Sequence, residues 1–294
     1  MKRLPELILA ATLGNRPFSD SIVSVDPATS SVKTLLSPTS GRSYTGVTGW
    51  SLHDPMIVQV DQLQDEATVQ SLISYDLIHK TVSPCCWDVP VKKGMGALSP
   101  DGTTYAFPDF PSAQASITVV ACNRNVPVIV GNFHAPEDRG NPSWYLSLEW
   151  AESGSELAAV HAWRLDGLHT ELQLIDTKTM TARTLVKYED GPVAASVAPD
   201  GRIAVLDKNG VEILSPGGGR TILLPNSAQR GRRYLGGGMA WLRFSDSVVL
   251  SLVDLNNGVT GEVWKINARA GSVEIIARKN GFMFSSLCSV LTDT

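Results

Sequence analysis

Apolar residues along the chain fall into many short runs, and the spacing expected for helices is nearly absent. Each run is bounded by glycine, proline, aspartate, asparagine or serine, the residues that favour turns. Clear examples are ELILAATL at 6–13, SITVV at 116–120, RIAVL at 202–206 and SVVLSLV at 247–253. Short apolar runs at regular spacing between turn residues are typical of an all-β sandwich, barrel or propeller.

One turn sequence recurs between these runs. LSPDG at 98–102 precedes TYAF at 104–107, and VAPDG at 197–201 precedes IAVL at 203–206. These residues suit a tight hairpin, because proline presets φ, aspartate caps the turn and glycine takes positive φ. Weaker copies of the turn follow Trp50, Trp150 and Trp241.

The large residue that ends the strand before each turn is a marker of the repeat. These markers are Trp50, Leu98, Trp150, Val197 and Trp241. They lie 48, 52, 47 and 44 residues apart, and a further step of 46 residues reaches Leu287. A period of this length predicts six similar units of four short strands each.

The first and last of these units are each incomplete. The segment that ends at Ser37 predicts three strands, and the segment 282–290 predicts one strand with no partners after it. We expect this last strand to complete the N-terminal blade and to close the ring without unpaired edges. The predicted fold class is all-β, a six-bladed β-propeller of four-stranded antiparallel blades, in one domain over 1–294. The expected blades are 5–37 plus 282–290, 44–86, 94–133, 144–187, 192–225 and 236–278.

The segments LSPDGTTYAF and VAPDGRIAVL resemble the repeats of six-bladed TolB-like (WD40-like, PD40) β-propellers. The spacing of the repeat extends the resemblance over most of the chain, and two blades carry the complete motif. It implies the six-bladed fold. It implies little about function, because propellers include enzymes, ligand binders and scaffolds.

Charge and hydropathy exclude several classes of protein. The chain has 25 Lys and Arg against 29 Asp and Glu, a net charge of −4, so we expect no nucleic-acid partner. A charged fraction of 18% and a hydrophobic fraction of 43% do not fit a disordered chain. No apolar run approaches the roughly 18 residues of a membrane-spanning helix. We expect a monomer.

The four cysteines are too sparse for a disulfide scaffold, and Cys85 and Cys86 are adjacent rather than spaced as a redox or zinc half-site. We therefore expect reduced, mostly buried thiols in a cytoplasmic protein. The segment MKRLPE followed by LILAATLG has the basic start and apolar stretch of a weak secretion signal, but a buried strand at 7–13 is the preferred interpretation. A periplasmic or secreted location, after removal of a signal peptide, is the alternative.

The longer connections are expected on one face of the ring, and binding residues usually lie on loops held by a rigid scaffold. The richest of these loops is 133–144, which contains His134, Glu137, Asp138 and Arg139 between Phe133 and Trp144. It shows no ligand spacing such as H-E-x-x-H, so a solvated loop is the preferred interpretation. Arg164 lies on the connection 163–170 and is a further candidate for ligand binding.

Two other features are candidates. Arg232 and Arg233 lie in the loop QRGRRY at 229–234 and could bind a carboxylate or phosphate by paired hydrogen bonds, although a solvated loop is again preferred. Glu149 precedes the marker Trp150, at a position where the other five blades have small residues. A carboxylate buried there would need a partner or a raised pKa, as in many active sites, with a structural salt bridge as the equal alternative.

Two functions from different classes follow. The first is a binding module that presents its long-loop face to a protein or peptide partner, because catalytic motifs are missing and these loops carry aromatic and arginine residues. Its ligand-binding candidates are Glu137, Arg139, Trp144, Arg164, Arg232 and Arg233. The alternative is a small-molecule hydrolase, lactonase or lyase with its site in the central funnel. Its catalytic candidates are Glu149, His134 and Asp138, with a divalent metal in the channel as its candidate cofactor.

Overall fold

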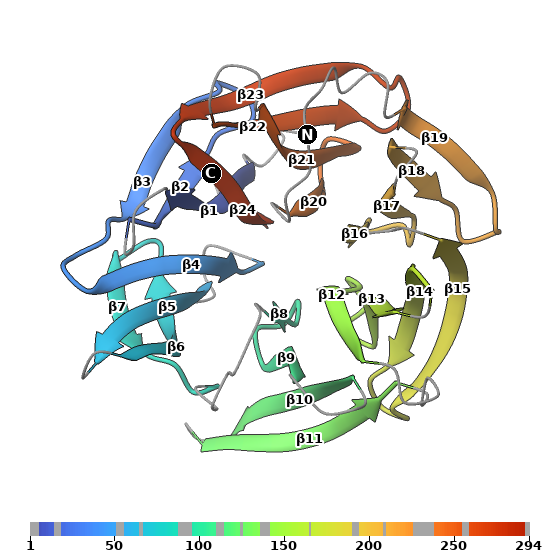
Figure 1. Ribbon diagram of the computed structural model, residues 1–294, viewed down its shortest axis with the longest axis horizontal. Coiled ribbons are helices and arrows are strands. Elements are labelled where there is room, and N and C mark those ends of the chain that lie inside the picture. The colour runs from blue at the N-terminus through green and yellow to red at the C-terminus, as the bar shows by residue number, and fades with distance from the viewer. Residues whose placement is uncertain are drawn as a thin grey trace. The chain divides into compact units, whose positions relative to one another are not determined.

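The computed structural model describes residues 6–14, 19–50, 56–64, 67–87, 96–109, 115–123, 126–135, 142–164, 166–189, 194–207, 210–225, 238–254 and 259–291. All regular structure in these ranges is β-strand, and the strands form six four-stranded antiparallel sheets (Figure 1). The predicted fold class, a six-bladed β-propeller of four-stranded antiparallel blades, is confirmed. Within the described ranges, no helix is both long and apolar enough to cross a membrane.

The chain folds as two units, and unit 1 spans Met1–Pro90 and Ser227–Thr294. Its strands are β1 (Glu6–Gly14), β2 (Ser21–Val25), β3 (Val32–Leu36), β4 (Arg42–Thr48), β5 (Met56–Gln64), β6 (Ala67–Asp76), β7 (Thr81–Pro84), β20 (Met239–Leu242), β21 (Ser247–Asp254), β22 (Thr260–Asn267), β23 (Val273–Asn280) and β24 (Phe282–Leu291). They form sheet A in the order β24-β1-β2-β3, sheet B in the order β4-β5-β6-β7 and sheet F in the order β20-β21-β22-β23.

Unit 2 spans Val91–Asn226. Its strands are β8 (Ala97–Leu98), β9 (Thr104–Asp109), β10 (Ser116–Asn123), β11 (Val126–His134), β12 (Ser143–Trp150), β13 (Glu156–Arg164), β14 (Leu168–Asp176), β15 (Thr181–Glu189), β16 (Ala194–Val197), β17 (Ile203–Asp207), β18 (Gly210–Leu214) and β19 (Arg220–Pro225). They form sheet C in the order β11-β10-β9-β8, sheet D in the order β12-β13-β14-β15 and sheet E in the order β16-β17-β18-β19.

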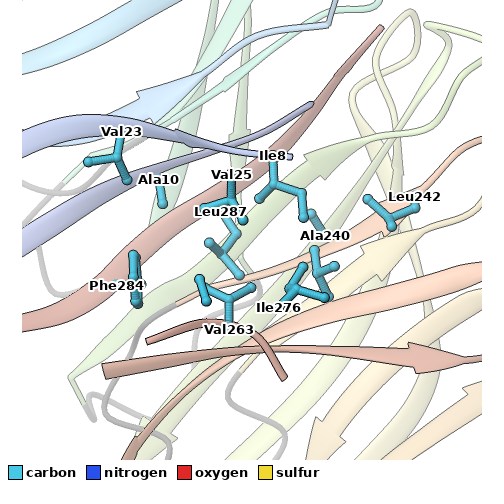
Figure 2. Packing of buried hydrophobic residues seen from close by; sticks show 12 residues of the cluster. Ile8, Ala10, Val23, Val25, Ala240, Leu242, Val263, Ile276, Phe284 and Leu287 are labelled. Carbon is cyan, nitrogen blue, oxygen red and sulfur yellow. The ribbon is translucent and has the colours of Figure 1, made fainter. Parts of the chain in front are cut away.

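The C-terminal strand completes the N-terminal sheet, as predicted. β24 pairs antiparallel with β1 from Glu6 opposite Leu291 to Gly14 opposite Phe282. Phe284 and Leu287 of β24 pack with Ile8 of β1 and with apolar residues of sheet F in a fully buried cluster (Figure 2). The closing strand therefore contributes both backbone hydrogen bonds and core packing to unit 1.

The two PDG turns form the hairpins that the sequence predicts. Gly102 and Gly201 have φ of 68° and 81°, in the left-handed region that glycine adopts without strain. The amide of each donates to the carbonyl three residues earlier, at 3.0 and 2.9 Å. In the first turn, Asp101 Oδ1 also accepts a hydrogen bond from Ser99 Oγ at 2.6 Å. Proline, aspartate and glycine thus have the separate roles that turn chemistry assigns to them.

Two of the repeat markers make contacts that extend beyond their own sheet. The indole Nε1 of Trp150 donates to the carbonyl of Ala97 in sheet C at 2.9 Å. The guanidinium of Arg243, beyond the end of β20 in unit 1, lies 3.4 Å from the centre of the Trp50 ring. At both positions, the large residue of the repeat therefore contacts another sheet of the same unit.

The expectation of four reduced thiols was wrong for two of them. Cys86 and Cys122 are disulfide-bonded, whereas Cys85 and Cys288 remain thiols. The sequence positions of four sparse cysteines do not indicate which of them form disulfides, because a disulfide depends on the approach of Cβ atoms in the folded chain.

We therefore expect two reactive thiols in the chain denatured without reductant, and four after reduction. The measurement is titration with a chromogenic thiol reagent in denaturant, with mass spectrometry of the alkylated chain as a second readout. Four reactive thiols before reduction, in protein purified without reductant, would contradict the disulfide form.

Candidate functional site

Several residues that the sequence suggested lie outside the described residues. These are Glu137, Asp138, Arg139, Arg232 and Arg233. Their assignment to ligand binding or catalysis stays a prediction. His134, Trp144, Glu149 and Arg164 are described, and all four belong to unit 2.

His134 and Glu149 lie on strands at different positions within their sheets. His134 is exposed at the end of β11, the strand at one edge of sheet C. Glu149 is half-buried on β12. This strand packs against β8 and β9, at the edge of sheet C opposite β11. The structure therefore does not bring these two candidates together, and the catalytic role of each stays a prediction.

Trp144 and Arg164 do come together. The guanidinium carbon of Arg164, at the end of β13, lies 6.0 Å from the centre of the Trp144 ring on β12. This distance is at the limit for a cation–π contact. The pair lies at the end of sheet D that carries the connection 163–170. The sequence predicts that this connection contributes to a binding face.

A cavity of about 540 Å³ opens at this end of sheets D and E. Its lining combines aromatic rings with charges of both signs and consists of Trp163, His169, Lys187, Tyr188, Glu189, Asp207 and Arg220. The volume lies within the range of about 300–1,000 Å³ that is typical of small-molecule sites. We call this space the sheet D cavity.

Strand register explains why these side chains meet. Trp163 of β13 pairs with His169 of β14, and His169 pairs with Glu189 of β15, so all three side chains point to one face of sheet D. The rings of Trp163 and His169 stack, with their centroids 5.7 Å apart and their planes 19° apart. Tyr188 points to the opposite face, because it directly precedes Glu189.

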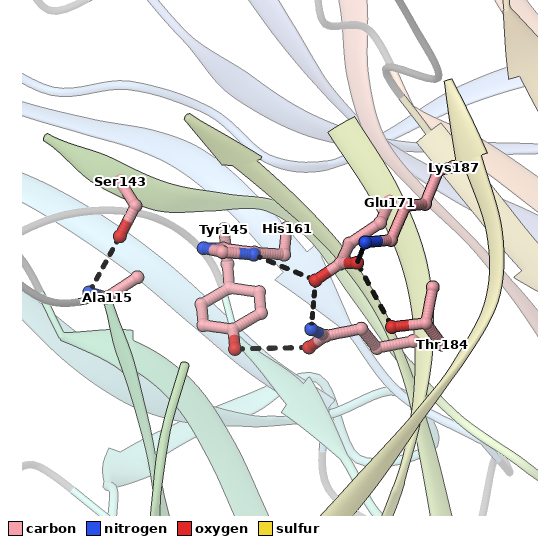
Figure 3. Close-up of polar contacts among 8 residues, drawn as sticks. Ala115, Ser143, Tyr145, His161, Glu171, Thr184 and Lys187 are labelled. Atoms are coloured by element: carbon pink, nitrogen blue, oxygen red, sulfur yellow. Dashed lines mark hydrogen bonds and ion pairs between the residues drawn. The ribbon is translucent and has the colours of Figure 1, made fainter. Parts of the chain in front are cut away.

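Beneath the cavity, the same face of sheet D carries a buried polar network around Glu171 (Figure 3). Oε1 of Glu171 lies 3.3 Å from His161 Nδ1 and accepts a hydrogen bond from Gln173 Nε2 at 2.6 Å. Oε2 accepts a hydrogen bond from Thr184 Oγ1 at 3.0 Å and lies 4.0 Å from Lys187 Nζ. Glu171, His161 and Gln173 are each less than 7% exposed. One buried carboxylate thus organises the side chains of three strands.

The ionisation of Glu171 reflects these contacts. Burial raises the pKa of this carboxyl, but the hydrogen bonds from His161, Thr184 and Gln173 outweigh burial and hold the pKa below its usual value. Burial also raises the pKa of Tyr145, whose hydroxyl lies 3.4 Å from Gln173 Oε1, and the Glu171 carboxylate raises it further. The network is therefore expected to hold a carboxylate and a neutral tyrosine near neutral pH.

A second buried carboxylate supports the other side of the cavity. Glu212 of β18 accepts a hydrogen bond from Tyr188 at 2.6 Å and two from Arg220 Nη2, at 2.7 and 3.0 Å. The guanidinium carbon of Arg220 also lies 5.4 Å from the centre of the Tyr188 ring. These contacts fix Tyr188 and Arg220, so the wall of the cavity is formed before any ligand binds.

The residues that line the sheet D cavity were not identified from the sequence. The sequence does, however, contain a pattern that indicates the buried polar residues beneath it. Glu171 and Gln173 alternate within HTELQLID at 169–176, and so place two polar side chains on one face of an otherwise apolar strand. Their partners on β13 and β15 depend on strand register, which the sequence does not show. Among the described residues, no group of three or more metal-ligating side chains was found.

The comparisons with known proteins bear on the fold. No protein-family model and no curated protein sequence matches the chain. Among solved structures, it is similar to TolB from Acinetobacter baumannii, with a TM-score of 0.70 and 13% identity over 98% of this chain and 67% of that one. It is also similar to a chain in a crystal structure of a nidogen–laminin complex, with a TM-score of 0.64 and 12% identity over 98% and 100% of the two chains. A third is the periplasmic gluconolactonase PpgL of Pseudomonas aeruginosa, with a TM-score of 0.55 and 14% identity over 96% and 99%.

Proposed function

We propose that the chain is a β-propeller binding module that takes a segment of a protein or peptide partner in the sheet D cavity. The observation that carries this proposal is the lining of the cavity, to which Trp163, Tyr188 and Arg220 all contribute. Tryptophan, tyrosine and arginine are the residue types that contribute most binding energy at protein interfaces.

The support beneath the cavity favours binding in a second way. Arg220 is held by Glu212, and Lys187 lies near the buried carboxylate of Glu171. Side chains that are already ordered lose less conformational entropy when a partner binds. One of the similar structures is a complex of nidogen with laminin, so a protein of this fold occurs in a protein complex.

Peptides can be selected from a displayed random library for binding to the full-length chain. We expect their affinity to depend on the sheet D cavity. The Trp163→Leu substitution removes the largest ring of the lining. We expect it to weaken the selected peptides at least about tenfold, because truncation of an interface hot spot costs ~2 kcal/mol or more. Isothermal titration calorimetry with each purified peptide provides the measurement.

A matched control is available at the other end of sheet D. Arg183 of β15 is 64% exposed and pairs with Glu156 at 3.6 Å, so Arg183→Ala should leave peptide affinity within about twofold. Thermal melts establish that both variants are folded. A library that yields no enriched peptide would contradict the proposal, as would peptides whose affinity Trp163→Leu leaves unchanged.

We also infer that the chain works in an oxidising compartment, the periplasmic or secreted alternative of the sequence analysis. The support is the disulfide-bonded state of Cys86 and Cys122, because disulfides persist in oxidising compartments and are rare in the cytosol. Trapping of thiols by alkylation in intact cells that express the natural protein tests this inference. Complete alkylation of all four cysteines would overturn it.

A further inference from the structure

We propose that the sheet D cavity takes a positively charged side chain of its partner, a lysine or an arginine. This inference rests on the proposed function and specifies the chemistry of the segment that binds. Three features of the cavity support it: its aromatic wall, its negative net charge, and the contacts of its own lysine and arginine with buried carboxylates.

The aromatic wall offers the faces that attract cations. Trp163 stacks with His169 on one face of sheet D, and Tyr188 lines the cavity from the opposite face. A cation within about 6 Å of such a ring is attracted by its quadrupole, most strongly by tryptophan. Arg164 over Trp144, and Arg220 of sheet E over Tyr188, show the same pairing. Because Arg220 already lies over Tyr188, we expect the ligand cation at the ring of Trp163.

The charges of the site sum to a negative value. Lys187 and Arg220 are the positive side chains of the lining, and Glu189 and Asp207 are the negative ones. The two carboxylates directly behind the cations, Glu171 and Glu212, are each less than 8% exposed. These six groups carry two positive and four negative formal charges, so their net formal charge is −2. An incoming cation is favoured by this sum and an incoming anion is not.

The positive groups of the lining are directed to these buried carboxylates. Arg220 donates through both Nε and Nη2 to Glu212, at distances from 2.7 to 3.2 Å. An anionic ligand would have to compete with Glu212 for this guanidinium and would also face the carboxylate of Glu189. In contrast, Glu189 is exposed and forms no ion pair or hydrogen bond through its side chain with a described residue. It can therefore accept an ion pair from a ligand.

The test is a titration of the full-length chain with single-residue probes, followed by NMR through the indole Nε1–H resonance of Trp163. The probes are Nα-acetyl-arginine methylamide, Nα-acetyl-lysine methylamide and, as the anionic control, Nα-acetyl-glutamate methylamide. Loss of one resonance in the Trp163→Phe variant assigns the signal. We expect the two cationic probes to bind at least about threefold more tightly than the anionic one.

Two charge variants should change the affinity for the cationic probes in opposite directions. Glu189→Gln removes an attractive charge and should weaken binding about twofold to fivefold, whereas Lys187→Gln removes a repulsive charge and should strengthen it by a similar factor. Arg183→Gln, at the far end of β15, should change nothing. A purely structural effect of the variants would shift both affinities in the same direction.

The outcomes separate this inference from the function on which it rests. The inference is overturned if the glutamate probe binds best, if both charge variants shift affinity in the same direction, or if no cationic probe binds. Selected peptides that need Trp163 but contain no conserved lysine or arginine would also overturn it, while leaving the proposed peptide binding intact. Binding of the cationic probes without any cavity-dependent peptide would contradict the proposed function alone.

Discussion

A chain that lacks residues 282–294 is expected to lose the cooperative unfolding transition of the full-length protein. The deletion removes β24, which pairs along the whole of β1 and buries Phe284, Leu287 and Val290 to 7% exposure or less. Burial of each such side chain contributes about 1.5–3 kcal/mol. Three of them approach the total stability of about 5–15 kcal/mol of a typical domain, before the lost backbone hydrogen bonds are counted.

A circular permutant separates the loss of the strand from the loss of chain continuity. Because β24 is antiparallel to β1, Leu291 lies opposite Glu6, and a short linker can join these two residues. A chain that begins at Phe282, continues through this linker to Glu6 and ends at Gly281 retains every strand pair. We expect it to melt cooperatively, as measured by circular dichroism. A truncated chain that melts like the full-length protein would show that β24 is dispensable.

Replacement of Glu171 by alanine is expected to have the second largest effect. It leaves His161 and Gln173 without their acceptor inside sheet D, and both residues are almost fully buried. Buried polar groups that lose a charged partner cost about 2–4 kcal/mol together. The midpoint of thermal unfolding should therefore fall by roughly 3–6 °C for a chain of this length.

The matched control for this substitution is a glutamate without buried partners. Glu152 is exposed in the turn that follows Trp150 and joins β12 to β13 of sheet D. Glu152→Ala should therefore change the free energy of unfolding by at most about 0.5 kcal/mol. Equal melting temperatures for Glu171→Ala and the parent chain would show that the buried network contributes nothing to stability.

The Glu171 network also predicts a dependence of stability on pH. The folded state holds the pKa of Glu171 below its usual value of 4.5, so it favours the ionised form more than the unfolded state does. This stabilisation is complete above pH 4.5 and is lost as the pH falls through the lowered pKa. Denaturant titrations at pH 3–7 should show a weaker loss of stability on acidification for Glu171→Gln than for the parent chain.

Local chemistry in the sequence was sufficient to predict the blades. The PDG turns need only proline, aspartate and glycine at adjacent positions, and these form the hairpins at Gly102 and Gly201. The pairing of β24 with β1 was also predictable, because a four-stranded repeat left three strands at one end and one at the other. The spacing of Trp50 and Trp150 located inner strands, although it did not reveal the contacts of their rings.

The candidate site was harder to predict, because it depends on register and on contacts between sheets. Glu171 meets His161 and Lys187 only because β13, β14 and β15 align these residues across sheet D. Glu212 reaches Tyr188 from the neighbouring sheet E, which no spacing within one blade indicates. Loop composition directed attention to 133–144 and 229–234, whereas the cavity is lined by residues of strands.

The pairing of the first strand with the last also has a consequence for synthesis on the ribosome. Gly14 ends β1 and Phe282 begins β24, so 268 residues separate the two partners in the sequence. At about 5–20 residues per second, the translating chain needs roughly 13–54 s between them. Sheets B to F are each built from consecutive strands and can form as they emerge, but β1 keeps one edge unpaired throughout this interval. The free edge of β1 is therefore open to wrong strand pairing until β24 has emerged and paired with it.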